Sequence, residues 1–230
     1  MKRGIGMISC NQFCDLYWIN YVSLEKELLQ ICRYVTLCEE NYETYSSAYL
    51  KLLLEIGSEV DIALKEYCKT LDSAFRGYNI VHYRECIMKY EQSFFNQIVD
   101  VNDGMLLLNP WNNKDEKGEY ISPFWWDVYN KCKHNRTQKG TIERKTKEYY
   151  KFANLKYTLN ALAGVYQTYA FMYKKLADAE GERIKVCLPG SRLFKLSGGI
   201  WDSIEFYKDI AFHVENDGYL YYETGKIPWW

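Results

Sequence analysis

A chain of 230 residues, 48% of them hydrophobic and 26% charged, has enough apolar side chains to bury a sizeable core. This composition excludes an intrinsically disordered chain, and a formal net charge of -1 excludes a strong overall attraction to nucleic acid. The eight cysteines include no Cys-x-x-Cys pair, which is typical of free thiols in a reducing cytosol. No signal peptide is evident and no apolar run of about 18 residues marks a membrane span. We therefore expect a cytoplasmic protein without membrane attachment.

Three helices are predicted in the first hundred residues. The first runs from about Ser23 to Cys38, with Ser23 as its N-cap. The second, from about Asn41 to Lys69, has apolar residues at the spacing of one helical face, so it is long and amphipathic. The third follows a turn at Gly77 and runs from Asn79 to Gln97.

A long ordered loop and two further helices are predicted next. The loop covers residues 102–122 and is anchored by Trp111. A short helix follows from Ser122 to Arg136, because Ser122 is a good N-cap and proline suits the first helical position. From Thr146 to Ala179 the chain is apolar on nearly every side, which predicts a helix at the centre of the core or in a subunit contact.

Beyond Gly181 the pattern changes to short alternating stretches, namely Arg183 to Leu188, Leu193 to Leu196 and Tyr219 to Glu223. Pro-Gly, Gly-Gly and Asp-Gly pairs separate them, which is typical of short strands joined by turns. The sequence therefore predicts a mainly α fold, an antiparallel helical bundle over residues 1–180, with little sheet before residue 181. A small irregular or β C-terminal appendage covers residues 181–230.

The helix from Ser122 to Arg136 has two different faces. At about 100 degrees per residue, one stripe is predicted to pack, and it consists of Trp125, Val128, Tyr129 and Cys132. The opposite side carries Trp126, Asp127, Asn130, Lys133 and His134. Asn130 lies four residues before His134, so its amide can hydrogen-bond the imidazole, and Lys133 adds a cation beside it. This face suits an anionic substrate, although a histidine that only complements the helix dipole is the alternative.

Charge is unevenly distributed along the chain. Residues 131–156 carry a net charge of +7, from nine Lys or Arg against two Glu, whereas residues 20–66 carry -5. The basic block directly follows the histidine helix, where it could bind phosphates. A solvated basic loop is the other interpretation.

The helix around His134 resembles the signature helix of HEPN-like helical proteins of bacterial defence and toxin systems, in the pattern Trp125-Trp126-x-x-Tyr129-Asn130-x-x-Lys133-His134-x-Arg136. The usual family pattern is an arginine, a polar residue that is often asparagine, three more residues and a histidine. Asn130 and His134 match it, and Tyr129 stands where the arginine is usual. A weaker likeness to the accompanying acidic helix falls on residues 52–61, so that the resemblance covers roughly residues 40 to 180.

The resemblance implies a helical, often dimeric fold and, in active members, a ribonuclease that needs no metal or other cofactor. On this interpretation His134 is the acid or base, Asn130 orients it or binds phosphate, and Lys133 and Arg136 stabilise negative charge. Lys131 and Tyr129 belong to the surroundings of the site. RNA is the expected substrate, and a partner protein of a defence or toxin system is a further expectation.

Two neighbouring side chains have open roles. Glu59 either enters the site as a supporting carboxylate or forms an ion pair with Lys133 or another base. Trp126 either stacks on an RNA base or closes a subunit interface. For the whole protein, two functions remain, namely a homodimeric ribonuclease with a composite histidine site and a non-catalytic HEPN-like module for binding or regulation.

Overall fold

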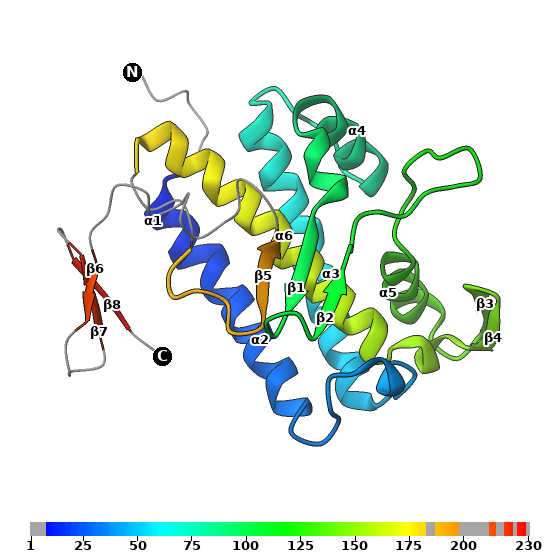
Figure 1. The fold of residues 1–230 in the computed structure, drawn as a ribbon. Helices are drawn as coiled ribbons and strands as arrows, with labels where there is room; N and C mark the ends of the chain where they lie inside the picture. The colour runs from blue at the N-terminus through cyan, green and yellow to red at the C-terminus, as the bar shows by residue number, and fades with distance from the viewer. Residues whose placement is uncertain (1–7, 183–186, 198–211, 215–218, 223–224, 229–230) are drawn as a thin grey trace.

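The computed structural model describes residues 8–182, 187–197, 212–214, 219–222 and 225–228. The fold is mainly α-helical, as predicted. Helix α6 (Leu155–Glu180) runs through the middle of the molecule, contacts α3 (Ser47–Leu71) most extensively and also touches α2 (Ile19–Ile31) (Figure 1). Side chains on every side of α6 are buried, which confirms that this helix is central to the core.

The N-terminal helix begins earlier than its predicted start. A short helix α1 (Cys10–Phe13) continues through a π-helical turn (Cys14–Trp18) into α2. Ser9 and Gln12 form a capping box at the start, in which each side chain accepts a hydrogen bond from the other residue's backbone N–H. Ser23 therefore lies inside α2, and the predicted cap there was wrong. The helix also ends at Ile31, short of the predicted Cys38.

The next two helices follow the predicted order with shorter bounds. Ser46 caps α3 by accepting a hydrogen bond from the N–H of Tyr49, so the helix begins at Ser47 and not at Asn41. Asn79 caps α4 (Ile80–Tyr90), as predicted. The predicted third helix to Gln97 breaks at Glu91, and a 3-10 turn covers Gln92–Asn96.

A three-stranded antiparallel sheet follows the 3-10 turn, and one of its strands lies in the predicted loop of residues 102–122. Strands β1 (Ile98–Val101) and β2 (Leu106–Leu108) form a hairpin, and β5 (Phe194–Ser197) pairs with the other edge of β1. Alternate residues of β1 are buried, as the pleat requires. These strands of three or four residues are too short for their alternation to stand out in the sequence. Beyond them, the indole N–H of Trp111 donates to the carbonyl of Gly164, so Trp111 anchors the remaining loop as predicted.

Helix α5 (Phe124–Asn135) lies beside a hairpin of β3 (Lys139–Ile142) and β4 (Lys145–Glu148) at one side of the molecule (Figure 1). The N-cap is Pro123 and not Ser122, whose carbonyl instead accepts a hydrogen bond from the Asn113 amide at 2.8 Å. Helix α6 begins at Leu155 behind its cap Asn154, because residues 146–152 form β4 and a 3-10 turn (Tyr149–Phe152). The predicted start of that helix at Thr146 was therefore nine residues too early.

The C-terminal segment contains short strands, in line with its predicted pattern. Strands β6 (Phe212–Val214), β7 (Tyr219–Tyr222) and β8 (Gly225–Pro228) form an antiparallel meander. Of the predicted stretch Arg183 to Leu188, residues 183–186 lie outside the described part. Strand β5 pairs with β1, so the segment after Gly181 contributes a strand to the sheet beside α6. The division into domains at residue 180 stays a prediction.

Candidate functional site

The packing stripe of α5 is buried as the sequence predicted. Trp125, Val128, Tyr129 and Cys132 are each at most 5% exposed, and the helix packs against α3 and α6. The indole N–H of Trp125 donates to the carbonyl of Pro110 at 2.8 Å, and its ring lies edge-on to Trp111. These contacts fix the rotation of α5, so that its polar side faces outward.

Tyr129, at the position of the usual family arginine, is a packing residue. Its ring lies directly over Gly57 of α3, where a Cβ atom would come within 2.1 Å of the ring carbon Cδ2. Its hydroxyl accepts a hydrogen bond from Lys133 Nζ at 3.3 Å. The side chain therefore reaches the edge of the polar face only with its oxygen.

Asn130 does not orient His134. Its Nδ2 donates to the carbonyl of Trp126, one turn earlier in the same helix, at 2.9 Å. The predicted amide to imidazole contact is thus replaced by a bond to the backbone. Trp126 itself is half-buried, with its ring 5.2 Å from that of Tyr129, so part of its surface is open on the polar side.

His134 is exposed on the last turn of α5, among the cations Lys131, Lys133 and Arg136, which are exposed as well. Within the described part of the chain, no carboxylate lies within ion-pair distance of these four side chains. Asp127 lies one turn before Lys131 and is exposed as a residue; partial desolvation of its carboxyl raises its pKa, and the charge of Lys131 partly opposes that shift. The end of α5 is therefore a positively charged surface that includes an imidazole.

The remaining basic block is largely neutralised by carboxylates. Lys145 and Lys147 of β4 both bind Glu43, at 2.7 and 2.9 Å. Lys151 pairs with Glu148, and Lys156 pairs with Glu143. The acidic and basic segments recognised in the sequence thus meet, and Glu43 is a structural residue that the sequence analysis missed. In the parts of the structure described, Lys139 and Arg144 of this block are exposed without an ion pair.

Glu59 lies apart from this surface. Its carboxylate accepts a hydrogen bond from the Tyr169 hydroxyl of α6, whereas Lys133 reaches Tyr129. Burial raises the pKa of Glu59, and the hydrogen bond from Tyr169 partly opposes that shift. The expected ion pair between Glu59 and Lys133 is not formed.

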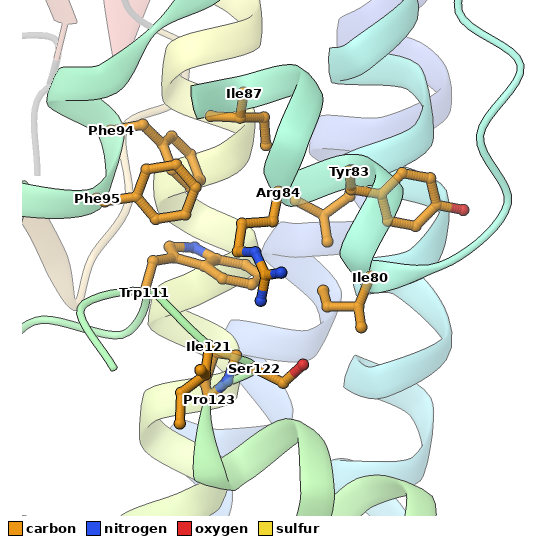
Figure 2. Close-up of a pocket in the computed structure, with 11 residues that line it drawn as sticks. Ile80, Tyr83, Arg84, Ile87, Phe94, Phe95, Trp111, Ile121, Ser122 and Pro123 are labelled. Atoms are coloured by element: carbon orange, nitrogen blue, oxygen red, sulfur yellow. The ribbon is translucent and has the colours of Figure 1, made fainter. Parts of the chain in front are cut away.

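A small pocket lies at the opposite end of α5 (Figure 2). Its lining includes Arg84 and Ile87 of α4, Trp111, and Ser122 and Pro123 before α5. The cavity volume of about 10 Å³ suffices for about one water molecule. His134 lies eleven positions after Pro123, a rise of about 16 Å along the helix. The pocket is therefore a small packing gap and not the substrate site of His134.

No group of three or more His, Cys, Asp or Glu side chains in the described residues could hold a metal ion. None of the helices in the same residues is both long and apolar enough to cross a membrane.

Comparison with known proteins gives one short match. Residues 113–147, which include α5 and the β3–β4 hairpin except Glu148, are similar to the fifth domain of the ATP-dependent helicase/deoxyribonuclease AddB. The match covers much less than half of the chain. No curated protein and no solved structure matches significantly.

Proposed function

We propose that this protein is a metal-independent endoribonuclease of a bacterial defence or toxin system, with a HEPN-like helical bundle and a composite site made by two copies of His134. The observation that carries the proposal is the exposed end of α5, where His134 stands among Lys131, Lys133 and Arg136. These side chains form no ion pair within the described residues, so they are available to an RNA phosphate. The sequence resemblance around Asn130 and His134 supports the same reaction.

The chemistry follows from the residues present. A neutral imidazole removes the proton of the ribose 2'-hydroxyl, the oxygen attacks the adjacent phosphorus, and the bond to the 5'-oxygen breaks. A protonated imidazole donates a proton to this leaving oxygen. Lys133 and Arg136 stabilise the added negative charge. One His134 from each subunit supplies the acid and the base, and the products carry 2',3'-cyclic phosphate and 5'-hydroxyl ends.

A non-catalytic binding module is the second candidate, and two contacts favour it. Tyr129 occupies the position of the usual arginine as a buried packing residue, and Asn130 is bonded to the helix backbone. In such a module, the same basic surface would bind RNA or an acidic surface of a defence partner without cleavage.

The deciding experiment measures cleavage of single-stranded RNA and transfer RNA by the purified protein in EDTA. We expect products with cyclic phosphate ends, and we expect His134→Ala to lower the rate by at least about a hundredfold, as loss of a general acid or base does. His82→Ala, a substitution in α4, serves as the matched control and should retain the rate. An inactive wild-type protein, or cleavage that survives His134→Ala, contradicts the ribonuclease.

Measurements of RNA affinity distinguish the binding module from a protein that does not bind RNA at this surface. Lys133→Ala should weaken RNA binding and reduce its salt dependence, because one phosphate contact is lost. Lys65→Ala removes an exposed lysine of α3 and should change neither quantity. Salt-dependent binding without cleavage identifies the binding module, whereas equal affinities for both variants rule out this surface as the RNA site.

A further inference from the structure

A larger hollow than the pocket beside α5 lies between α2 and the segment 189–192. Its volume is about 450 Å³, within the range of about 300–1,000 Å³ that is usual for small-molecule sites. Val22, Leu29 and Pro189 provide apolar lining, and Lys26, Arg33 and Arg192 provide positive charge. The His134 surface contributes none of these residues.

The α2 wall follows from helical spacing. Val22, Lys26 and Leu29 lie at intervals of four and three residues, so they share one side of the helix. Arg33 continues the same row one turn later, where its backbone N–H donates to the carbonyl of Gln30 at 3.3 Å. Aliphatic and cationic side chains therefore alternate along one wall.

The opposite wall is held in place by buried hydrogen bonds. The Glu25 carboxylate, which is 2% exposed, accepts the N–H groups of Arg192 and Leu193, both at 3.1 Å. It also accepts hydrogen bonds from the hydroxyls of Tyr21 and Ser191. The four donors together occupy both carboxylate oxygens. Glu25 thus positions the backbone of Arg192 and forms no ion pair with the three cations among the described residues.

A second hydrogen bond fixes the beginning of the same segment. The indole N–H of Trp18 donates to the carbonyl of Pro189 at 2.9 Å, and the Trp18 ring stacks on Tyr21 at 4.6 Å. Residues 189–193 are therefore bound at both ends to the N-terminal helix. The hollow has two preorganised walls, which lowers the entropy cost of binding a ligand.

Three cations with no ion pair in the described residues line this hollow, together with Glu25, whose carboxylate oxygens are occupied by the four hydrogen bonds. Guanidinium groups bind phosphate through paired N–H donors, and the aliphatic lining suits a carbon skeleton. We propose that the hollow binds a small organic phosphate, with the phosphate at Lys26, Arg33 and Arg192 and the apolar part against Val22, Leu29 and Pro189. A hollow of this volume with an apolar lining favours a small molecule over the backbone of an RNA chain.

Calorimetric titration of the full chain with phenyl phosphate, inorganic phosphate and phenol tests the proposal. Phenyl phosphate carries both the charge and an apolar ring, so it should bind in a one-to-one complex. Inorganic phosphate should bind at least about tenfold more weakly, and phenol should not bind. Absence of saturable binding of phenyl phosphate at millimolar concentration overturns the proposal, as does stronger binding of phenol than of inorganic phosphate.

Charge-removing variants locate the bound phosphate. Arg33→Gln and Arg192→Gln should each weaken phenyl phosphate binding at least about tenfold. Both side chains are exposed, so circular dichroism and thermal unfolding should stay unchanged. Lys65→Gln removes an exposed cation of α3 and should leave the affinity unchanged. The assignment is overturned if Lys133→Gln weakens the binding of phenyl phosphate and Arg192→Gln does not. It is also overturned if an oligoribonucleotide binds but neither phenyl phosphate nor inorganic phosphate does.

Discussion

A single glycine determines how closely α3 and α5 approach each other. Gly57 faces the Tyr129 ring, and a Cβ atom at this position would lie 2.1 Å from Cδ2 and 2.4 Å from Cε2. Non-bonded carbon atoms do not approach each other this closely, so the Tyr129 ring or one of the helices must move when residue 57 carries a Cβ atom. The site histidine is on the same helix as Tyr129, and the placement of His134 therefore depends on Gly57.

We predict that Gly57→Ala destabilises the protein by about 1–3 kcal/mol, the usual cost of excess volume in a packed core. The higher helix propensity of alanine offsets only part of this cost. Urea unfolding measures the effect, and Ser58→Ala, at an exposed position of the same helix, should change stability by less than about 0.5 kcal/mol. Equal stabilities of the two variants would show that the Tyr129 ring moves aside without cost.

Glu59 gives a second prediction at the scale of one residue. Burial raises its pKa above the ordinary value of a glutamate, and the hydrogen bond from Tyr169 does not fully cancel the shift. Its contribution to stability is therefore fully present below the unfolded pKa and is lost as pH rises through the folded pKa. Glu59→Gln should be more favourable relative to the wild type at pH 7 than at pH 4, in urea unfolding at both values.

Tyr169→Phe, in the same pair, should strengthen the pH dependence that Glu59→Gln removes. It removes the hydrogen bond that lowers the Glu59 pKa, so stability should fall more steeply with rising pH than in the wild type. If Glu59→Gln leaves the pH dependence unchanged, Glu59 is not the group responsible.

At the scale of elements, the β3–β4 hairpin is held to the chain before α3 by Glu43. Burial alone would raise the pKa of this carboxyl. The hydrogen bonds from Lys145 and Lys147 lower the pKa by more than burial raises it, so the pKa is below its usual value. The interaction stabilises the protein above the unfolded carboxyl pKa and is lost as pH falls through the folded value. Both lysines return to solvent when the carboxylate is neutralised.

We predict that Glu43→Gln loosens the hairpin while changing the free energy of unfolding by less than about 1 kcal/mol, as is usual for exposed ion pairs. Hydrogen exchange of residues 139–148 should be faster in the variant. The released Lys145 and Lys147 should also steepen the salt dependence of RNA binding. Glu55→Gln, which removes an ion pair with Lys51 inside α3, is the control and should change neither measurement.

For the whole molecule, the proposed reaction needs a two-fold homodimer. His134 is the histidine on the α5 surface, and one imidazole cannot be base and acid in the same step. Light scattering at micromolar concentration should therefore give about twice the chain mass. Trp126 is half-buried beside this face and is available to such an interface.

Mixed dimers test the composite site more directly than mass alone. When His134→Ala protein replaces most of the wild type at constant total protein concentration and the subunits exchange, activity should fall nearly as the square of the wild-type fraction, because mixed dimers lack one histidine. The same excess of His82→Ala protein should not lower the activity. A monomer that cleaves RNA would rule out the composite site.

The sequence by itself determined the features that depend on near neighbours. The buried stripe of α5, the start of α4 behind Asn79 and the central position of α6 follow from helical hydrogen bonds and periodicity over a few residues. The Gly77 turn marks the start at Asn79 in the sequence, whereas the caps Ser46 and Asn154 were not predicted. The predicted starts at Asn41 and Thr146 were too early, because the apolar periodicity begins before the residue that caps each helix.

Only the tertiary structure decided the contacts between distant segments. Strand β5 pairs with β1 across nearly a hundred residues, Glu43 binds lysines more than a hundred residues away, and Glu25 accepts N–H groups of the segment that begins at Ser191. It also decided that Tyr129 packs on Gly57. Periodicity places a side chain on a face of its element, whereas the partner of that side chain depends on which elements pack together in three dimensions.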